Sequence, residues 1–247
     1  MANWAGCMLR REAIVDSTNR QARLWAQAGA PHGAVLIADM QTAGRGRRGR
    51  QWLSHSGAGL WLSIVLRPDW PEGRLPLLTF AVALAGLDAI EAATGLCGAA
   101  KWPNDLLVDG RKVAGILLEK EGDAVVAGIG SNARQRPGDF PPELADSAAS
   151  LSMLAGRDIA PAMLEAPFFA AIERWVDAPD DLIDAFSARC ATLGAQVRVL
   201  AGDEEYEGLA ERIDAEGALW VRPDGGAARR VLAGDVSVRG LMGYGRS

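Results

Sequence analysis

The feature that most constrains the fold is a change of pattern near residue 192. Before that point, apolar runs of strand type alternate with segments that have helical spacing. After it come only short alternating runs, separated by the turn sequences "AGDE", "DAEG" and "PDGG". Closely spaced strands of this kind predict a small β-barrel, so we expect a larger domain over residues 1–190 and a C-terminal domain over residues 191–247.

The larger segment mixes both kinds of element. Asp16, Ser17 or Thr18 can cap a helix over residues 18–28, which Gly29 can end. The other expected elements are strands at 34–41 and 60–68, a buried alanine-rich helix at 76–93, a hairpin over 99–120 turning at Asp109-Gly110, a strand at 124–133, and helices at 161–176 and 179–190. This order predicts an α+β fold.

Composition excludes several classes of protein. The chain has 247 residues, of which 49% are hydrophobic and 23% charged, as in a compact globular protein. Its net charge of -5 argues against a main affinity for nucleic-acid phosphates. Cys7, Cys97 and Cys190 form neither a disulfide framework nor a metal motif, and the two histidines give no His-rich metal site. Because no secretion signal precedes the fold, we expect a cytoplasmic protein.

The segment "GRGRRGR" at residues 44–50 places four arginines among three glycines. The glycines match the G-x-G-x-x-G pattern of dinucleotide-binding turns, which needs a strand before it and a helix opening on it. A strand does precede it, but the following "RQWLSHSGAGL" leaves no room for a helix before the strand at 60. Two interpretations stay open on these residues alone: a solvated basic loop, or a loop whose backbone and guanidinium groups surround an anionic ligand.

Two further segments carry polar groups at defined places. In "KWPNDLL", Lys101 ends a strand directly before a Trp-Pro pair that restricts the backbone. It is either an ordered cation or a surface lysine. Asn104 and Asp105 either coordinate a metal or form a turn, and the turn is favoured. In "STNR", Ser17, Thr18 and Asn19 serve as helix caps, and the same groups can hydrogen-bond a polar head group.

Taken together and in this order, the segments resemble biotin protein ligases. The matching text is "STN" (17–19), "QTAGRGRRGRQW" (41–52), "KWPNDLLVDGRKVAGILLE" (101–119), "GIGSN" (128–132) and "GDVSVR" (234–239). The resemblance implies a catalytic domain related to class II aminoacyl-tRNA synthetases, with a mixed sheet flanked by helices, followed by an SH3-like barrel. Some members carry an N-terminal DNA-binding domain, for which the position of "STN" leaves no room here. We therefore expect a ligase without repressor function.

The resemblance also implies a reaction in two steps. ATP, bound with Mg²⁺, activates biotin to biotinyl-5'-AMP, and the biotinyl group then passes to a lysine of a biotin carboxyl carrier domain. The residues implied to bind biotin are Ser17, Thr18, Asn19, Gln41, Arg45, Gly46, Arg47 and Lys101. Among them, Arg45, Arg47 and Lys101 would be catalytic. Arg47, Asn132 and Arg239 would contact ATP, and no dedicated metal site is expected.

Three expectations about behaviour accompany this interpretation. The cationic loop at residues 44–51 should be mobile without ligand and become ordered with biotin or the adenylate. The partner is the carrier domain of acetyl-CoA carboxylase or a related carboxylase, with no DNA and no membrane, and a homodimer remains open. The rival interpretations are a lipoate ligase or octanoyltransferase and a nucleic-acid-binding protein that uses the arginine loop.

Overall fold

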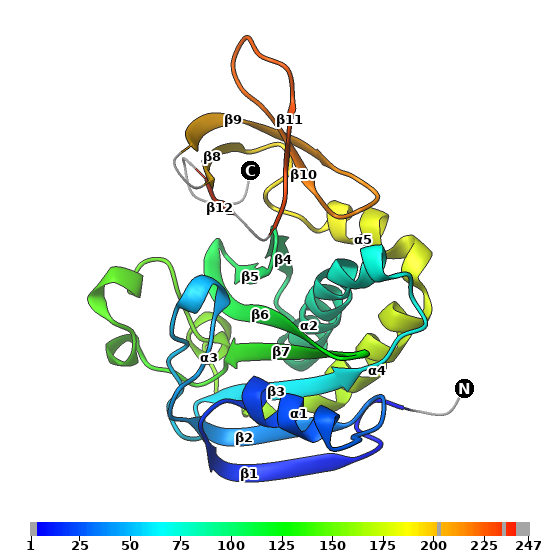
Figure 1. Ribbon diagram of the computed structural model, residues 1–247. Helices are drawn as coiled ribbons and strands as arrows, with labels where there is room; N and C mark the ends of the chain where they lie inside the picture. The colour runs from blue at the N-terminus through cyan, green and yellow to red at the C-terminus, as the bar shows by residue number, and fades with distance from the viewer. Residues whose placement is uncertain (1–3, 202–203, 234–235, 241–247) are drawn as a thin grey trace.

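The computed structural model describes residues 4–201, 204–233 and 236–240, which form two β-sheets (Figure 1). The larger sheet has seven strands in the order β1-β2-β3-β7-β6-β5-β4, with β1 and β2 parallel and the other neighbours antiparallel. Its strands are β1 (Leu9–Val15), β2 (Val35–Gln41), β3 (Gly59–Leu66), β4 (Gly98–Lys101), β5 (Asp105–Val108), β6 (Arg111–Glu121) and β7 (Ala124–Asn132).

The smaller sheet is antiparallel and has the order β11-β10-β9-β8-β12. Its strands are β8 (Gln196–Ala201), β9 (Glu204–Ile213), β10 (Leu219–Arg222), β11 (Arg229–Val231) and β12 (Val236–Gly240). A mixed sheet with helices followed by a separate strand-rich unit confirms the predicted α+β class. The domain boundary at residue 190 stays a prediction.

The α-helices cover the larger sheet. They are α1 (Thr18–Gln27), α2 (Leu78–Thr94), α3 (Leu151–Ala155), α4 (Glu165–Asp177) and α5 (Leu182–Ala188). Short 3-10 helices lie at η1 (Arg47–Gly49), η2 (Glu72–Leu77), η3 (Pro137–Asp139), η4 (Pro142–Leu144), η5 (Pro161–Leu164) and η6 (Pro179–Asp181). The helix start expected near Ser17 and the helix ends expected near Gly29 and residue 93 agree with these bounds.

Alternate residues of the central strands face two helical layers. Leu36 of β2 and Val65 of β3 pack with α1, while Val35 and Ile64 belong to the main core that contains α2 and α4. Helix α2 is apolar around nearly its whole circumference, since other elements of the protein pack on most of its sides. The segment from Glu72 to Thr94 is apolar and long enough to cross a membrane, yet 67% of its most apolar window is buried, as expected for a core helix.

Strand β1 was not expected from the sequence. Residues 9–14 are exposed, so the strand "LRREAIV" shows no alternation between core-facing and solvent-facing side chains. It is positioned by backbone pairing with β2, from Leu9 opposite Val35 to Val15 opposite Gln41. Sequence periodicity reports burial, so it gives no signal for an edge strand of this kind.

The hairpin expected over residues 99–120 contains three strands. The predicted turn at Asp109-Gly110 is confirmed, with φ of 49° and 73° at the two residues, as type I′ turns require. A second turn, at residues 102–104, separates β4 from β5, which agrees with the strand end predicted at Lys101 and with the turn favoured at Asn104. This turn brings Lys101 and Asp105 opposite each other at one end of the sheet.

The smaller sheet is held against that end of the larger one (Figure 1). The indole Nε1 of Trp102 donates a 3.0 Å hydrogen bond to the Gly217 carbonyl, and the Trp102 amide donates to Thr192 Oγ1 at 3.0 Å. Gly217 also packs on Leu77 and Phe80, where an added Cβ would lie 2.8 Å from the Leu77 side chain. The turn that follows Lys101 is therefore a contact point between the two sheets.

Candidate functional site

A single cavity of about 710 Å³ collects the residues that the sequence singled out. This volume is within the range of ~300–1,000 Å³ common for ligand pockets. The predicted site residues that line it are Ser17, Thr18, Asn19, Gln41, Arg45, Gly46, Arg47, Lys101 and Asn132. Arg239 lies on β12 with its backbone paired to Arg198, but its side chain is outside the described part of the structure.

The N-terminus of α1 forms the neutral end of the cavity. Ser17 caps the helix, and its Oγ accepts from the Arg20 amide at 3.5 Å. Gln41, at the end of β2, accepts from both the amide and the hydroxyl of Thr18, at 2.8 and 3.1 Å. Ser17, Thr18 and Asn19 are each at most 4% exposed, so this end presents ordered, uncharged hydrogen-bonding groups.

Asn19 is held by three elements of the sheet. Its Nδ2 donates to the Leu117 carbonyl at 3.1 Å and to Glu119 Oε2 at 3.0 Å, and its Oδ1 lies 2.6 Å from Ser63 Oγ. An added Cβ at Gly128 would lie 2.1 Å from Asn19 Oδ1, so only glycine at that position leaves room for the amide. The sequence analysis did not single out Ser63, and it included Gly128 only as the first residue of "GIGSN", without a role.

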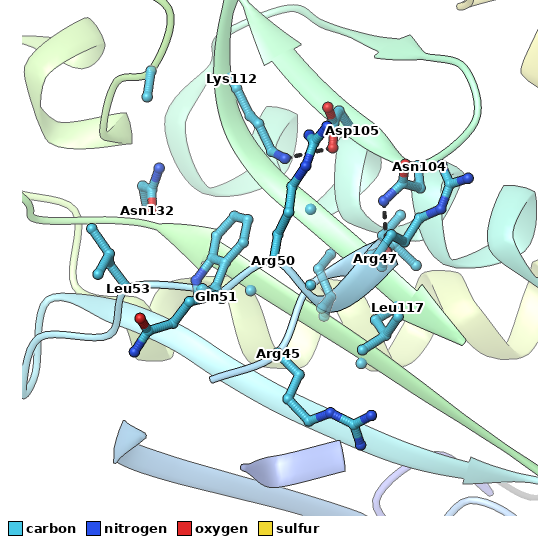
Figure 2. Close-up of a pocket in the computed structure, with 18 of the residues that line it drawn as sticks. Arg45, Arg47, Arg50, Gln51, Leu53, Asn104, Asp105, Lys112, Leu117 and Asn132 are labelled. Atoms are coloured by element: carbon cyan, nitrogen blue, oxygen red, sulfur yellow. Dashed lines mark hydrogen bonds and ion pairs between the residues drawn. The ribbon is translucent and has the colours of Figure 1, made fainter. Parts of the chain in front are cut away.

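The arginine loop, residues 44–50, crosses the cavity. Arg45 and Gln51 form an antiparallel β-bridge at its base, and the Gly46 amide donates to the Arg50 carbonyl at 2.8 Å. Arg48 has a φ of 57°, in the left-handed region. Arg45 forms an ion pair with Glu119 at 2.9 Å. The loop is thus one turn of backbone that displays cationic side chains along the cavity (Figure 2).

Arg47 is the most enclosed of these arginines. Its Nη1 donates to Asn104 Oδ1 at 2.8 Å, and its Nη2 donates to the Ala233 carbonyl of the C-terminal unit (Figure 2 shows the first contact). Burial lowers the pKa of Arg47, opposed by the charge of Asp105. A desolvated guanidinium interacts more strongly with an anionic ligand than one in water does.

A second cation lies near Arg47 and was not singled out by the sequence analysis. Lys112 Nζ is 2.6 Å from Asp105 Oδ1 (Figure 2). It also lies 5.1 Å from the centre of the Trp52 ring. The ion pair fixes the ammonium group at the cavity wall. The quoted segment "DGRKVAGILLE" contains Lys112, but the sequence does not tell which of Lys101 and Lys112 projects an ordered ammonium into the cavity.

Trp52 lies over two glycines of neighbouring strands. An added Cβ would lie 2.7 Å from its ring at Gly115 of β6 and 2.9 Å at Gly130 of β7. These glycines therefore make room for a flat ring in the floor of the cavity. Trp52 Nε1 is buried and has no hydrogen-bond partner among the residues that the structure describes. An unsatisfied buried donor at the edge of a cavity is a candidate contact for a ligand acceptor.

The far end of the cavity carries amide groups. Asn132 is 6% exposed, its Nδ2 donates to the Ala149 carbonyl at 3.3 Å, and its Oδ1 accepts from Gln135 Nε2 at 3.1 Å. Gln135 Oε1 is buried, and no atom in the described part of the chain forms a hydrogen bond with it. This end thus offers one further acceptor, which the sequence analysis did not single out.

The glycines of β7 give the length of the cavity. Gly128 adjoins Asn19, Gly130 adjoins Trp52, and Asn132 ends the strand. Four residues of strand span roughly 13 Å. The neutral end beside Gly128 and the amide end at Asn132 are therefore separated by about this distance, which an extended ligand can span, and Trp52 lies between them.

Comparison with known proteins agrees with this arrangement. A model of the "Biotin/lipoate A/B protein ligase family" matches residues 12–134, and a model of the "Biotin protein ligase C terminal domain" matches residues 192–239. A Mycobacterium tuberculosis protein named biotin–[acetyl-CoA-carboxylase] ligase is 39% identical over 91% of this chain and 86% of its own length. The chain belongs to the biotin protein ligase family.

Two more members of the family are similar over most of the chain. The bifunctional ligase/repressor BirA of Bacillus subtilis is 36% identical over 91% of this chain and 72% of its own length. The solved biotin protein ligase from Aquifex aeolicus, in complex with biotin and ATP, is 30% identical and superposes with a TM-score of 0.83, covering 94% of this chain and 98% of that one. The first matched region contains the predicted site residues that line the cavity, and the second contains β8 to β11 and all but the last residue of β12.

Proposed function

We propose that this protein activates biotin with ATP to biotinyl-5'-AMP and transfers the biotinyl group to a lysine of a biotin carboxyl carrier domain. The observation that carries the proposal is the order of groups along one cavity: neutral hydrogen-bonding groups at Asn19, enclosed cations at Arg47 and Lys112, and amides at Asn132. The solved Aquifex relative, with biotin and ATP bound, supports the same pair of substrates.

Each part of the cavity matches one part of the substrates. The ureido ring of biotin is uncharged and both donates and accepts hydrogen bonds, which suits the groups of Thr18, Asn19 and Gln41. Its carboxylate and the phosphates of ATP are anionic and suit Arg47 and Lys112. The base is flat and carries donors and acceptors at its edge, which suits the far end of the cavity.

In the first step, a carboxylate oxygen of biotin attacks the α-phosphorus of ATP, and pyrophosphate leaves. The step brings two anions together and concentrates negative charge on the phosphoryl oxygens. Enclosed cations stabilise that charge without reorganisation. Arg47 is fixed by Asn104 and Lys112 by Asp105, so both would hold their charge in place before the substrates bind. No general base is needed, since a carboxylate is ionised at neutral pH.

In the second step, the amine of the carrier lysine attacks the carbonyl carbon of the mixed anhydride. AMP leaves with the bonding electrons, and the amine loses a proton to solvent. Arg45, Arg47, Lys101 and Lys112 remain near the leaving phosphate and stabilise it. The neutral end of the cavity would hold the biotin ring, and the cations would hold the phosphate. The carbonyl of the mixed anhydride, which joins the two, would therefore lie between them.

Mg²⁺ belongs to this proposal as a companion of ATP. Among the described residues, no cluster of three His, Cys, Asp or Glu side chains could hold a metal ion. Magnesium is commonly bound through substrate phosphates with only one or two carboxylates, and Asp105 and Asp139 line the cavity. The donor set therefore fits an ion that arrives with the nucleotide, where it would neutralise phosphate charge.

The proposal includes a cytoplasmic location and the absence of DNA binding. A net charge of -5 supports the latter, because DNA affinity depends on a cationic surface. Cys7 and Cys97 are free and exposed, which suits a reducing compartment. A salt-dependent gel shift and cell fractionation test these two points.

The deciding experiment is carrier biotinylation. The protein is incubated with ATP, biotin and a purified carrier domain, and the carrier is then probed with labelled streptavidin. We expect biotin on the carrier lysine and none when ATP is left out. Parallel reactions with lipoate or octanoate address the alternative within the same family, and transfer of those acids in place of biotin would reassign the substrate.

A further inference from the structure

Glu119 lies behind the wall of the cavity. It follows Leu117 by two residues on β6, and Leu117 lines the cavity whereas Glu119 is not among the described residues that line it. Its strand partner Val126 packs with α1, so the Glu119 side chain faces the same helix. The side chain is only 14% exposed, and an enclosed carboxylate needs donors for both oxygens. Glu119 can therefore act on a ligand only through the residues that supply those donors.

One oxygen of Glu119 orients the amide of Asn19. Asn19 Nδ2 donates to Glu119 Oε2 at 3.0 Å and to the Leu117 carbonyl at 3.1 Å, which uses both amide protons. Asn19 Oδ1 is thereby turned toward Ser63 and toward Gly128, which lines the cavity. A carbonyl oxygen accepts two hydrogen bonds, so Oδ1 can accept one from an N–H of the ureido ring in addition to that from Ser63.

The other oxygen of Glu119 anchors the arginine loop. Arg45 lies at the base of the loop, in the β-bridge with Gln51, and its Nη1 is 2.9 Å from Glu119 Oε1. Figure 2 shows the Arg45 side chain extending away from Asp105 and Lys112. The base of the loop is therefore tied to the neutral end of the cavity and not to the cluster of cations.

A third cation beside Glu119 is held mainly by another carboxylate. Arg23 Nη1 lies 3.4 Å from Glu119 Oε1, whereas Arg23 Nη2 lies 2.6 Å from Glu121 Oε2 and Arg23 Nε donates to the same oxygen at 2.8 Å. The shorter contacts with Glu121 leave Glu119 Oε1 chiefly to Arg45. The pair of Arg23 and Glu121 joins α1 to β6 and offers a separate structural contact for comparison.

We infer that Glu119 is a positioning residue that couples recognition of the biotin ring to the placement of the arginine loop. Its two oxygens belong to one rigid group, so the rotamer that orients Asn19 also places an acceptor at Arg45. A ligand that fixes the Asn19 amide thereby favours the anchored loop, and the anchored loop favours binding of that ligand to the same extent. The assignment rests on the proposed function, because it takes the ureido ring to lie beside Asn19.

Glu119→Gln breaks this arrangement with little change of size. A glutamine amide has one oxygen and one NH2 group, so its nitrogen must face a donor of either Asn19 or Arg45. We expect the Kd for biotin, measured by calorimetry without ATP, to rise about tenfold or more, because one enclosed donor is left without an acceptor. Removing a negative charge would by itself favour an anionic ligand, so a loss of affinity reports the lost positioning.

Arg23→Gln is the control for a purely structural role of Glu119. It removes the ion pairs that join α1 to β6 and leaves the contacts of Glu119 with Asn19 and Arg45 in place. We expect a Kd for biotin within about twofold of the wild type. Thermal melting of each variant checks folding. A rise in Arg23→Gln as large as that in Glu119→Gln would assign the effect to helix packing and overturn the inference.

A double-mutant cycle measures the coupling itself. Arg45→Ala should raise the Kd for biotin by a factor about threefold or more smaller in Glu119→Gln than in the wild type, since the anchor is already lost. Arg48→Ala, on the same loop, is the control and should act equally in both backgrounds.

The outcomes separate this inference from the proposed function. A wild-type protein that binds no biotin would overturn both. Biotin binding by the wild type with an unchanged Kd in Glu119→Gln, or an equal effect of Arg45→Ala in both backgrounds, would overturn the role of Glu119 alone.

Discussion

At the scale of single residues, Lys112 and Lys101 line the same cavity from different strands. The resemblance to biotin protein ligases implied that Lys101 binds biotin and is catalytic. Lys112 has the geometry that such a role requires, with Nζ held 2.6 Å from Asp105 beside Trp52. The sequence could not separate the two, because the direction of each side chain depends on the pairing of β5 with β6, which shifts register between Leu106 and Leu107.

We therefore expect Lys112→Ala to lower the rate of biotinyl-adenylate formation by about 10²–10³-fold, the usual cost of losing one group that stabilises transition-state charge. Lys101→Ala should cost less. Lys120→Ala is the matched control, since Lys120 forms an ion pair with Glu72 outside the cavity. Single-turnover formation of the adenylate gives all three rates. A larger loss of rate in Lys101→Ala than in Lys112→Ala would show that Lys101 is the more important lysine for adenylate formation.

Gly128 offers a test of the neutral end of the cavity. The methyl group of Gly128→Ala would meet Asn19 Oδ1 and displace an amide whose Nδ2 contacts Leu117 and Glu119. Losing one such buried hydrogen-bonding group costs about 1–3 kcal/mol, so the KM for biotin should rise about tenfold or more.

The KM for ATP should change little in Gly128→Ala, because Asn132 lies at the other end of β7. Gly138→Ala is the control, since an added Cβ there meets no described atom within 4 Å. Steady-state kinetics with each substrate varied in turn gives both values. An unchanged KM for biotin would contradict the placement of the biotin ring beside Asn19.

At the scale of elements, helices and strands were predicted most accurately where burial of one face imposes a regular spacing of apolar residues. The strands near 34–41, 60–68 and 124–133 and the helix near 18–28 agree with β2, β3, β7 and α1 within a few residues. The edge strand β1 was missed because both its faces are exposed. The sequence also gave no sign of Gln135 as part of the cavity, since its buried side chain follows β7 in an irregular segment.

The arginine loop is the element whose behaviour remains to be measured. Arg45 and Arg47 contact Glu119, Asn104 and the Ala233 carbonyl, so the loop touches both sheets. Charge repulsion among its arginines and the entropy of its glycines oppose ordering, and an anionic ligand offsets both. Limited trypsin cleavage within residues 44–51 should slow when biotinyl-5'-AMP is added.

Lipoate serves as the control ligand in that experiment, because we expect the neutral end of the cavity to bind the ureido ring of biotin, which lipoate lacks. Equal cleavage rates within the loop with and without the adenylate would contradict its role as a cover for the ligand. Equal protection by lipoate would show that protection does not report recognition of biotin.

A turn of the C-terminal sheet carries a pH-dependent contribution to stability. Asp214 accepts hydrogen bonds from the Glu216 and Ala218 amides, Trp220 Nε1 and Arg230 Nε, at 2.7–3.0 Å. Burial by itself raises the pKa of Asp214, but the hydrogen bonds from Arg230, Trp220 and the amides outweigh it and lower the pKa to about 2. The ionised carboxylate is therefore the form that the folded turn holds.

Since the ordinary pKa is 3.8, the ionised form stabilises the fold fully above that pH, and the contribution is lost as the pH falls from 3.8 through about 2. A shift of this size corresponds to about 2 kcal/mol. Asp214→Asn should lower the free energy of unfolding near neutral pH and flatten its decline in acid. Denaturant titrations followed by tryptophan fluorescence measure this, with Asp224→Asn as control. If the free energy of unfolding fell equally steeply below pH 3.8 in wild type and in Asp214→Asn, the contribution of Asp214 would be ruled out.

At the scale of the whole molecule, the C-terminal unit contacts the larger sheet beside the cations of the cavity. Trp102 follows Lys101 and bonds Gly217, and Arg47 bonds the Ala233 carbonyl. The sequence predicted two units from the change of pattern near residue 192. It could not predict that they meet at the cations of the cavity, because such contacts join residues far apart in the chain.

The central claim is that this one cavity activates biotin with ATP. Biotin-dependent exchange of labelled pyrophosphate into ATP measures that step directly and needs no carrier. We expect exchange that requires biotin, is not supported by lipoate, and is nearly lost in Arg47→Ala while the variant keeps its wild-type melting behaviour. Exchange that is absent with biotin, or that proceeds unchanged in Arg47→Ala, would show that this cavity does not carry out the activation step.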